Sequence, residues 1–88
     1  MNIIPNEKKL TSSIIFINLA SLFTEYCREN CDDNVLYYKR DNDVITISKD
    51  AEAIMNIIVT DDDVRINQLV MHDDLFQSSR KFIQTLVN

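Results

Sequence analysis

Glycine is absent from this chain of 88 residues. Loops that bind phosphate groups in nucleotide-binding folds need glycine, because a side chain would block the approach of backbone N–H groups to the phosphate. We therefore expect no nucleotide cofactor, and no cofactor of any other kind. Asn and Asp are the other residues that best tolerate a left-handed backbone, so their clusters predict the turns. These clusters are residues 32–34, 41–43, 61–63 and 73–74.

Histidine occurs once, at His72, and cysteine twice, at Cys27 and Cys31. These three side chains could begin a zinc site, but the second pair of ligands that structural zinc usually has is missing. Four positions apart on a helix, the Cβ atoms of the cysteines lie about 6 Å from each other, whereas a disulfide requires about 4 Å. We predict reduced cysteines, no metal and no enzymatic activity.

Long hydrophobic runs are also missing. The longest apolar stretch, residues 14–23, is interrupted by Asn18 and Ser21 and is shorter than the roughly 20 residues that a membrane-spanning helix needs. Lys8 and Lys9 precede it as in a signal peptide, but no small-residue cleavage motif follows. We expect no membrane segment and a cytoplasmic location, which is the host cytoplasm if a virus encodes the protein.

The residues that are present predict one globular domain over residues 1–88, since 45% are hydrophobic and 26% are charged. Fourteen acidic residues against nine basic ones give a net charge of −5. This charge disfavours nucleic acid and anionic membranes and favours basic partners. The aromatic and basic run Tyr37 to Arg40 would suit base stacking, but the acidity of the chain argues against direct nucleic-acid binding.

Two helices are predicted from apolar spacing and capping residues. Thr11, Ser12 or Ser13 can cap a helix that runs to about Asn30, and Asp73 can cap a C-terminal helix. The predicted buried stripe of the C-terminal helix comprises Leu75, Phe76, Phe82, Ile83, Leu86 and Val87.

Strands are predicted between the helices. Residues 35–49 indicate a β-hairpin that turns at Asp41-Asn42 and places Tyr38 opposite Ile45. Residues 50–59 fit either a helix start or a strand, and we favour a strand from about Ile54. Alternation after residue 63 predicts one more strand, whose register depends on a three- or four-residue turn. Only the four-residue turn places Ile57, Val59, Val64 and Ile66 on one face.

The predicted fold class is therefore α+β, in two layers, with an N-terminal helix, an antiparallel meander of three or four strands and a C-terminal helix. With acids concentrated in its turns, we expect a non-enzymatic protein-binding module. Immunity proteins and phage-encoded inhibitors share this general character, and such a module would occlude a basic, nucleic-acid-binding site on a protein partner. The candidate contact residues are Asp41, Asp43, Asp61, Asp62 and Asp63.

The alternative is a structural or assembly subunit. The N-terminal helix is apolar over more than one face, and an exposed apolar face favours association into a homodimer. The candidate interface residues are Ile14, Ile15, Phe16, Leu19 and Phe23.

Overall fold

The computed structural model describes residues 2–30, 36–70 and 73–88, which form a five-stranded antiparallel sheet and two helices. The predicted α+β class is confirmed, with one more strand than the sequence indicated. The elements are β1 (Asn2–Pro5), α1 (Ser12–Asn30), β2 (Leu36–Asp41), β3 (Val44–Lys49), β4 (Glu52–Val59), β5 (Asp63–Gln68) and α2 (Asp73–Val87).

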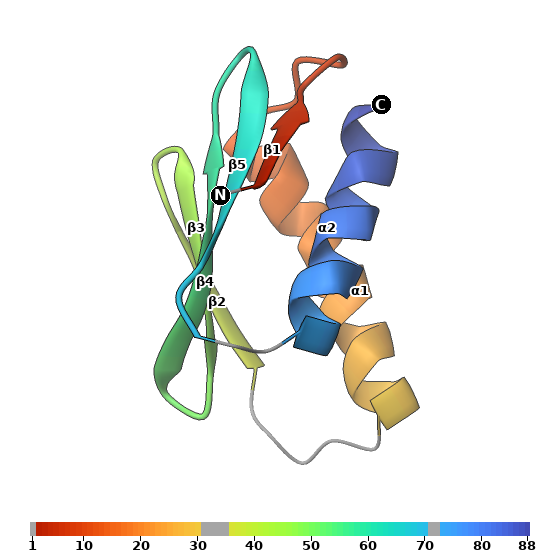
Figure 1. The fold of residues 1–88 in the computed structure, drawn as a ribbon, viewed down its shortest axis with the longest axis vertical. Coiled ribbons are helices and arrows are strands. Elements are labelled where there is room, and N and C mark those ends of the chain that lie inside the picture. Colours follow the sequence, from red (N-terminus) through yellow and green to blue (C-terminus); the bar gives the residue numbers. More distant parts are fainter. Residues whose placement is uncertain (1, 31–35, 71–72) are drawn as a thin grey trace.

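Both helices pack on one face of the sheet, and no described segment covers the other face (Figure 1). The strand order is β1-β5-β4-β3-β2, so β2 to β5 form the predicted meander and β1 pairs with β5. Helix α1 contacts β2, β3 and α2. Neither described helix is both long and apolar enough to cross a membrane.

The core lies between the helices and the sheet. From α1, Ile15, Leu19 and Phe23 are buried at a spacing of four residues, which is the spacing of one helix face. The ring of Tyr38 in β2 lies 5.1 Å from Phe16 and 5.2 Å from Phe23 between ring centroids. The sheet contributes one residue from β1, Ile4, and eight from the other strands: Ile45, Ile47, Ile54, Met55, Ile57, Val59, Val64 and Ile66.

Helix α2 buries the side that its apolar spacing predicted. Leu75, Phe76, Ile83 and Val87 are in the core, and Phe82 and Leu86 are partly buried against it. The structure adds Ser79, which is completely buried on the same side. A serine is small and polar, so the hydrophobic pattern did not identify it.

The first hairpin turns one residue later than predicted. The turn is Asn42-Asp43, the closing pair is Asp41 and Val44, and Tyr38 lies opposite Ile47 rather than Ile45. Asn42 has a φ of 54°, a left-handed conformation that asparagine tolerates better than most residues. The error moves each cross-strand partner by two positions, which is the side-chain period of a strand, so the predicted inward face is unchanged.

Strand β4 resolves the ambiguity of residues 50–59 in favour of a strand, which begins at Glu52 rather than near Ile54. A β-bulge interrupts its pairing with β3, because Ile47 pairs with Met55 while Ser48 pairs with Ala53. Ile54 and Met55 are both 1% exposed, although consecutive strand residues normally point to opposite faces. The extra residue at the bulge lets both side chains enter the core.

Strand β5 follows β4 through the longer of the two predicted turns. Val59 pairs with Val64 and Ile57 with Ile66, so residues 60–63 lie between the first pair. The sequence did not predict β1, where Ile4 pairs with Val64 and is buried. Pro5 is the last residue of β1.

Candidate functional site

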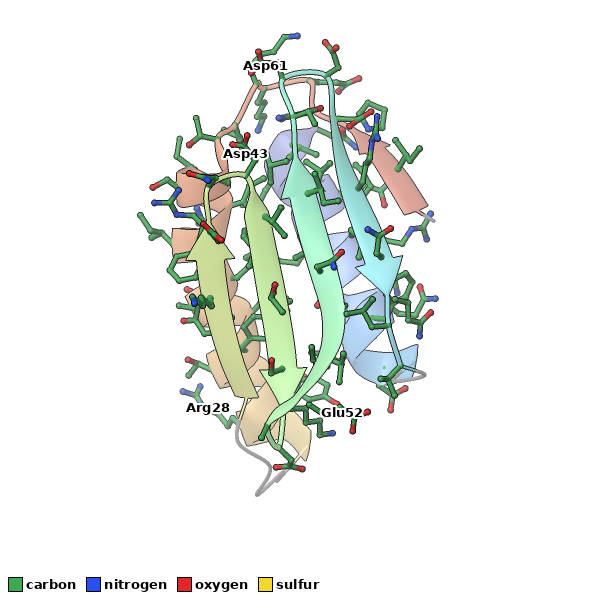
Figure 2. The ribbon with its side chains drawn as sticks, turned by 90° about the vertical axis from the view of Figure 1, so that its left-hand side faces the viewer. Arg28, Asp43, Glu52 and Asp61 are labelled. Carbon is green, nitrogen blue, oxygen red and sulfur yellow. The ribbon has the colours of Figure 1, made fainter. Side chains whose placement is uncertain are left out.

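Two of the predicted acidic turns lie at the same end of the sheet. In an antiparallel meander the first and third turns share one end, so the β2–β3 and β4–β5 turns are neighbours. Figure 2 shows Asp43 and Asp61 at this end and Arg28 and Glu52 at the opposite end. Residues 41–43 and 61–63, far apart in the sequence, therefore form one acidic end of the molecule.

A hollow of about 270 Å³ lies between these turns and the start of α1. Asp43 enters its lining from one hairpin and Asp61 from the other. The remaining lining residues are Leu10, Thr11, Ser12, Val59 and Thr60.

The start of α1 gives the hollow a partial positive charge. Thr11 Oγ1 accepts a hydrogen bond from Ile14 N–H at 3.3 Å, and the first turn of α1 contains no acidic residue. The N-terminal end of a helix dipole favours negative charge. Asp43 and Asp61 line the same hollow as Thr11 and Ser12, so two acidic side chains border the end of α1 that favours negative charge.

Hydrogen bonds attach α1 to the β2–β3 turn. Ser12 is buried and donates from Oγ to the Asn42 carbonyl at 2.7 Å, which Arg40 Nη1 also approaches at 3.2 Å. The position of Asp43 relative to α1 is therefore determined by buried contacts.

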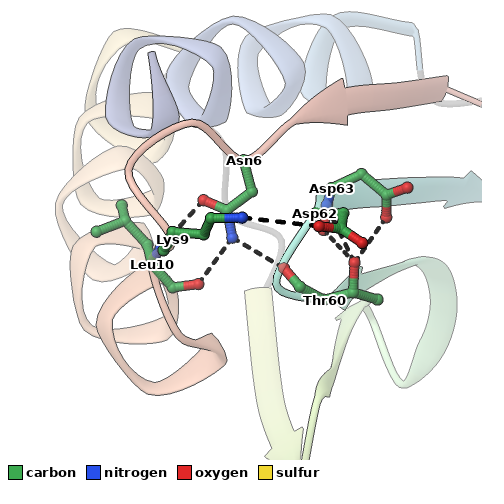
Figure 3. A network of polar contacts seen from close by, with 6 residues as sticks. All are labelled: Asn6, Lys9, Leu10, Thr60, Asp62 and Asp63. Atoms are coloured by element: carbon green, nitrogen blue, oxygen red, sulfur yellow. Dashed lines mark hydrogen bonds and ion pairs between the residues drawn. The ribbon is translucent and has the colours of Figure 1, made fainter.

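Asn6 attaches the β1–α1 loop to the β4–β5 turn on the other side (Figure 3). Its side chain is nearly buried, with 2% of the residue surface exposed. Nδ2 donates to the carbonyls of Leu10 and Thr60, both at 2.9 Å, and Oδ1 accepts from Leu10 N–H at 3.0 Å. The Asn6 backbone N–H also bonds to the Asp62 carbonyl at 3.0 Å. This one residue therefore closes its own loop through Leu10 and joins it to the β4–β5 turn.

Asp62 and Asp63 differ from the other acids at this end. The Asp63 carboxylate accepts hydrogen bonds from Thr60 Oγ1 at 2.9 Å and Arg65 Nε at 3.2 Å, so it stabilises the turn. Asp62 is 91% exposed and lies 3.6 Å from Lys9 Nζ. Such an exposed ion pair contributes little stability.

Asp41, Asp43 and Asp61 remain as the acids with the most available carboxylates. All three are exposed, and their side chains make no ion pair or hydrogen bond with any described residue. We therefore centre the candidate site on these three residues.

The structure divides the five predicted interface residues of α1. Ile15, Leu19 and Phe23 belong to the core of the chain itself, and Phe16 is half-buried against Tyr38. Ile14 is 44% exposed. Ile17, which is not among the five predicted residues, is 68% exposed.

The uncovered face of the sheet is mainly polar. Asn67 Nδ2 donates to Asn56 Oδ1 at 2.9 Å across two strands, with Thr46 next to Asn56 in the register. Lys39 is exposed on this face, and Tyr38 points to the other face as expected. The side chain of Tyr37, the other aromatic residue of this strand, lies outside the described residues, so the expected lack of direct nucleic-acid binding stays a prediction.

The three side chains that could have begun a zinc site lie outside the described ones. Cys31 and His72 lie there entirely, and only the backbone of Cys27 is described, so the prediction of no metal stays a prediction. Within residues 2–30, 36–70 and 73–88, no group of three or more His, Cys, Asp or Glu side chains could hold a metal ion.

The chain matches no protein-family model, no characterised protein and no solved structure.

Two features of the site were not predicted from the sequence. The proximity of the two acidic turns follows from the meander topology and was available from the predicted fold. The role of Asn6 had no sequence signal, because a single asparagine after a proline predicts only a turn.

Proposed function

We propose that the chain is a non-enzymatic protein-binding domain whose acidic end occupies a basic, nucleic-acid-binding site on a partner protein. The observation that supports this most is the convergence of Asp43 and Asp61 on one hollow, with Asp41 at the end of β2 beside the turn that carries Asp43. Carboxylates on two adjoining hairpins resemble the spaced negative charges to which a basic groove is complementary.

The rigidity of this end also favours binding. Asn6 and Ser12 are buried and hydrogen-bonded, so both acidic turns are held in place before a partner arrives. A preorganised surface loses less conformational entropy on association, and more of the interaction energy then contributes to affinity.

The charges around the hollow make a test possible. Asp43 and Asp61 are the acidic residues in its lining, and in the neighbouring loop Lys8 and Lys9 outnumber Glu7, with Lys9 paired to Asp62. Removing the charges of Asp43 and Asp61 therefore eliminates most of the acidic character of the hollow. The matched control is E29Q/E52Q, which removes two exposed acids near the opposite end.

The experiment uses immobilised chain to capture a partner from its native host, followed by association kinetics with that purified partner at low and high salt. We expect D43N/D61N to lower the association rate constant several-fold at low salt and E29Q/E52Q to leave it nearly unchanged. Screening beyond about 10 Å at 0.1 M salt should reduce the difference. A partner that stays bound in 1 M salt and does not distinguish the two variants would contradict the proposal.

The exposure of Ile14 and Ile17 favours a second function, that of an assembly subunit. They lie three positions apart on the outer side of α1, where apolar contact with another molecule would bury them. Such association would persist or strengthen at high salt, opposite to the acidic end. The variant I14E/I17E would abolish it and leave the charge-dependent binding intact.

A further inference from the structure

The sheet has two outer edges that pair with no other described strand, and they differ in their capacity to accept one. Strand β1 has four residues, and the main-chain groups of its positions 3 and 5 face outward. The reason is that Ile4 pairs with Val64 of β5 and the Asn6 N–H bonds to the Asp62 carbonyl just before β5. Pro5 has no N–H to donate, so proline protects this edge. Strand β2 has six residues and no proline.

The main-chain groups of β2 alternate between its neighbour and solvent. The hairpin closes at the Asp41–Val44 pair, so residues 37, 39 and 41 bond to β3. Residues 36, 38 and 40 therefore direct their N–H and C=O groups away from the sheet. None of these groups has a backbone partner outside the sheet among the described residues.

An uncharged side of α1 borders this edge. Ser13, Phe16, Ala20 and Thr24 follow each other at spacings of three and four and so lie on one side of the helix. Phe16 contacts Tyr38 of β2, which places this side next to the open edge. Figure 2 likewise shows α1 behind the β2 side of the sheet. An added strand would therefore meet main-chain hydrogen-bonding groups and an uncharged helix side together.

We propose that the β2 edge pairs with the β2 edge of a second copy of this chain, antiparallel and with a two-fold axis at Tyr38. In this register residue 38 pairs with residue 38 of the second copy, and residue 36 pairs with residue 40 of the second copy. The outward N–H and C=O groups of the two strands then bond to each other. Lys39 then lies opposite residue 37, which is a neutral tyrosine. An axis at Lys39 would instead oppose two lysines, which is destabilising.

Arg40 does not obstruct this pairing. Its guanidinium donates to the Asn42 carbonyl at 3.2 Å and so turns toward the hairpin. Because proline protects the β1 edge, each copy has only one edge that can accept a strand. A two-fold interface uses this edge of both copies, so the assembly stops at a dimer. This dimer is independent of the acidic end and of Ile14 and Ile17.

The test measures self-association of the full chain by sedimentation equilibrium over a wide concentration range. R40P removes an outward N–H and places a ring at the edge, while the bonds of residues 39 and 41 to β3 stay intact. R40A is the matched control, because it removes the guanidinium and keeps the N–H. I3P places the same obstruction at the β1 edge, where Ile3 is 57% exposed.

We expect R40P to raise the dimer dissociation constant at least about tenfold, equivalent to 1.4 kcal/mol, and R40A and I3P to leave it within about twofold. A circular dichroism spectrum verifies that R40P is folded. If it is not, amide hydrogen exchange of the wild-type chain replaces it, and the amides of Tyr38 and Arg40 should become protected as concentration rises while that of Ile3 does not.

Three results would overturn the proposal. The first is a mass of 10.3 kDa at every concentration. The second is a dimer that R40P leaves intact and I14E/I17E abolishes, which would place the interface on the outer side of α1. The third is a monomer whose β2 amides become protected only when an extended peptide from another protein is added.

Discussion

Among the polar loop residues at the acidic end, Asn6 is the one whose replacement by alanine should destabilise the fold most. The substitution removes three side-chain hydrogen bonds of 2.9 to 3.0 Å. It leaves the N–H and C=O of Leu10 and the C=O of Thr60 without those partners. A buried polar group without a partner costs about 1 to 3 kcal/mol.

The expected loss lies toward the lower end of that range for each group. Leu10 is half-buried and Thr60 is exposed, so water can replace part of what is lost. We expect N6A to reduce the free energy of unfolding by about 2 to 4 kcal/mol. An 88-residue domain has about 4 to 13 kcal/mol in total, so the loss is a large fraction of its stability.

The variant N6D separates hydrogen bonding from packing, because it has nearly the same size and shape. Its carboxylate can still accept from Leu10 N–H, but it would face the carbonyls of Leu10 and Thr60 where Nδ2 now donates. Burial beside two carbonyls raises the pKa of the introduced carboxyl in the folded state above the unfolded value of about 3.9. Stability is then highest below the unfolded pKa and is lost as pH rises through the folded one.

Urea denaturation followed by far-ultraviolet circular dichroism measures both variants. With a slope of about 1 to 2 kcal/mol per molar urea, a loss of about 2 kcal/mol or more should lower the N6A midpoint by at least about 1 M, and N6D should recover as the pH is lowered. The control is N18A, which removes an exposed bond from Asn18 to the Ile14 carbonyl. Its free energy of unfolding should stay within about 0.5 kcal/mol of wild type, because alanine favours a helix. An N6A midpoint equal to that of N18A would refute the role given to Asn6.

Three further substitutions test the turns, the core and the helix end. Asp50 and Ala51 have φ values of 52° and 68° in the β3–β4 turn. A51G should raise stability by about 0.5 to 1 kcal/mol, since relief of the left-handed strain exceeds the added unfolded-state entropy; a lower melting temperature would show that the turn is not left-handed at this position. Ser79 is completely buried, and its hydroxyl has no partner among the described residues. S79A should therefore raise the urea midpoint by an amount equivalent to about 1 kcal/mol, whereas a decrease would reveal a hydrogen bond to water. D43N/D61N should lower stability by about 0.5 to 1 kcal/mol at low salt and by less in 1 M salt, and an effect independent of salt would exclude the helix dipole as its cause.

The sequence by itself determined the elements whose stability depends on local periodicity. Helix α1 begins at one of the predicted capping residues and ends at Asn30, and α2 buries its predicted apolar stripe. The hairpin pattern predicted the inward face of β3, and alternation predicted β5. The turn before β5 stayed open between three and four residues, and the structure has the four-residue turn. These features depend only on neighbours that are close in the chain, so short stretches of the sequence predict them.

The tertiary structure alone decided whatever depends on a distant partner. The four residues of β1 carry no periodic signal and form a strand because β5 offers an edge to them. Ile54 and Met55 both reach the core only because the pairing with β3 contains a bulge. Ile15, Leu19 and Phe23, predicted to contact another chain, are covered instead by the sheet and α2.

The candidate site also depends on the tertiary structure. The two acidic turns become one site because antiparallel pairing returns the chain to the same end of the sheet. Asn6 acquires its role from the carbonyls of Leu10 and Thr60, which only folding brings within reach. Such contacts join residues far apart in the sequence, and no local propensity encodes them.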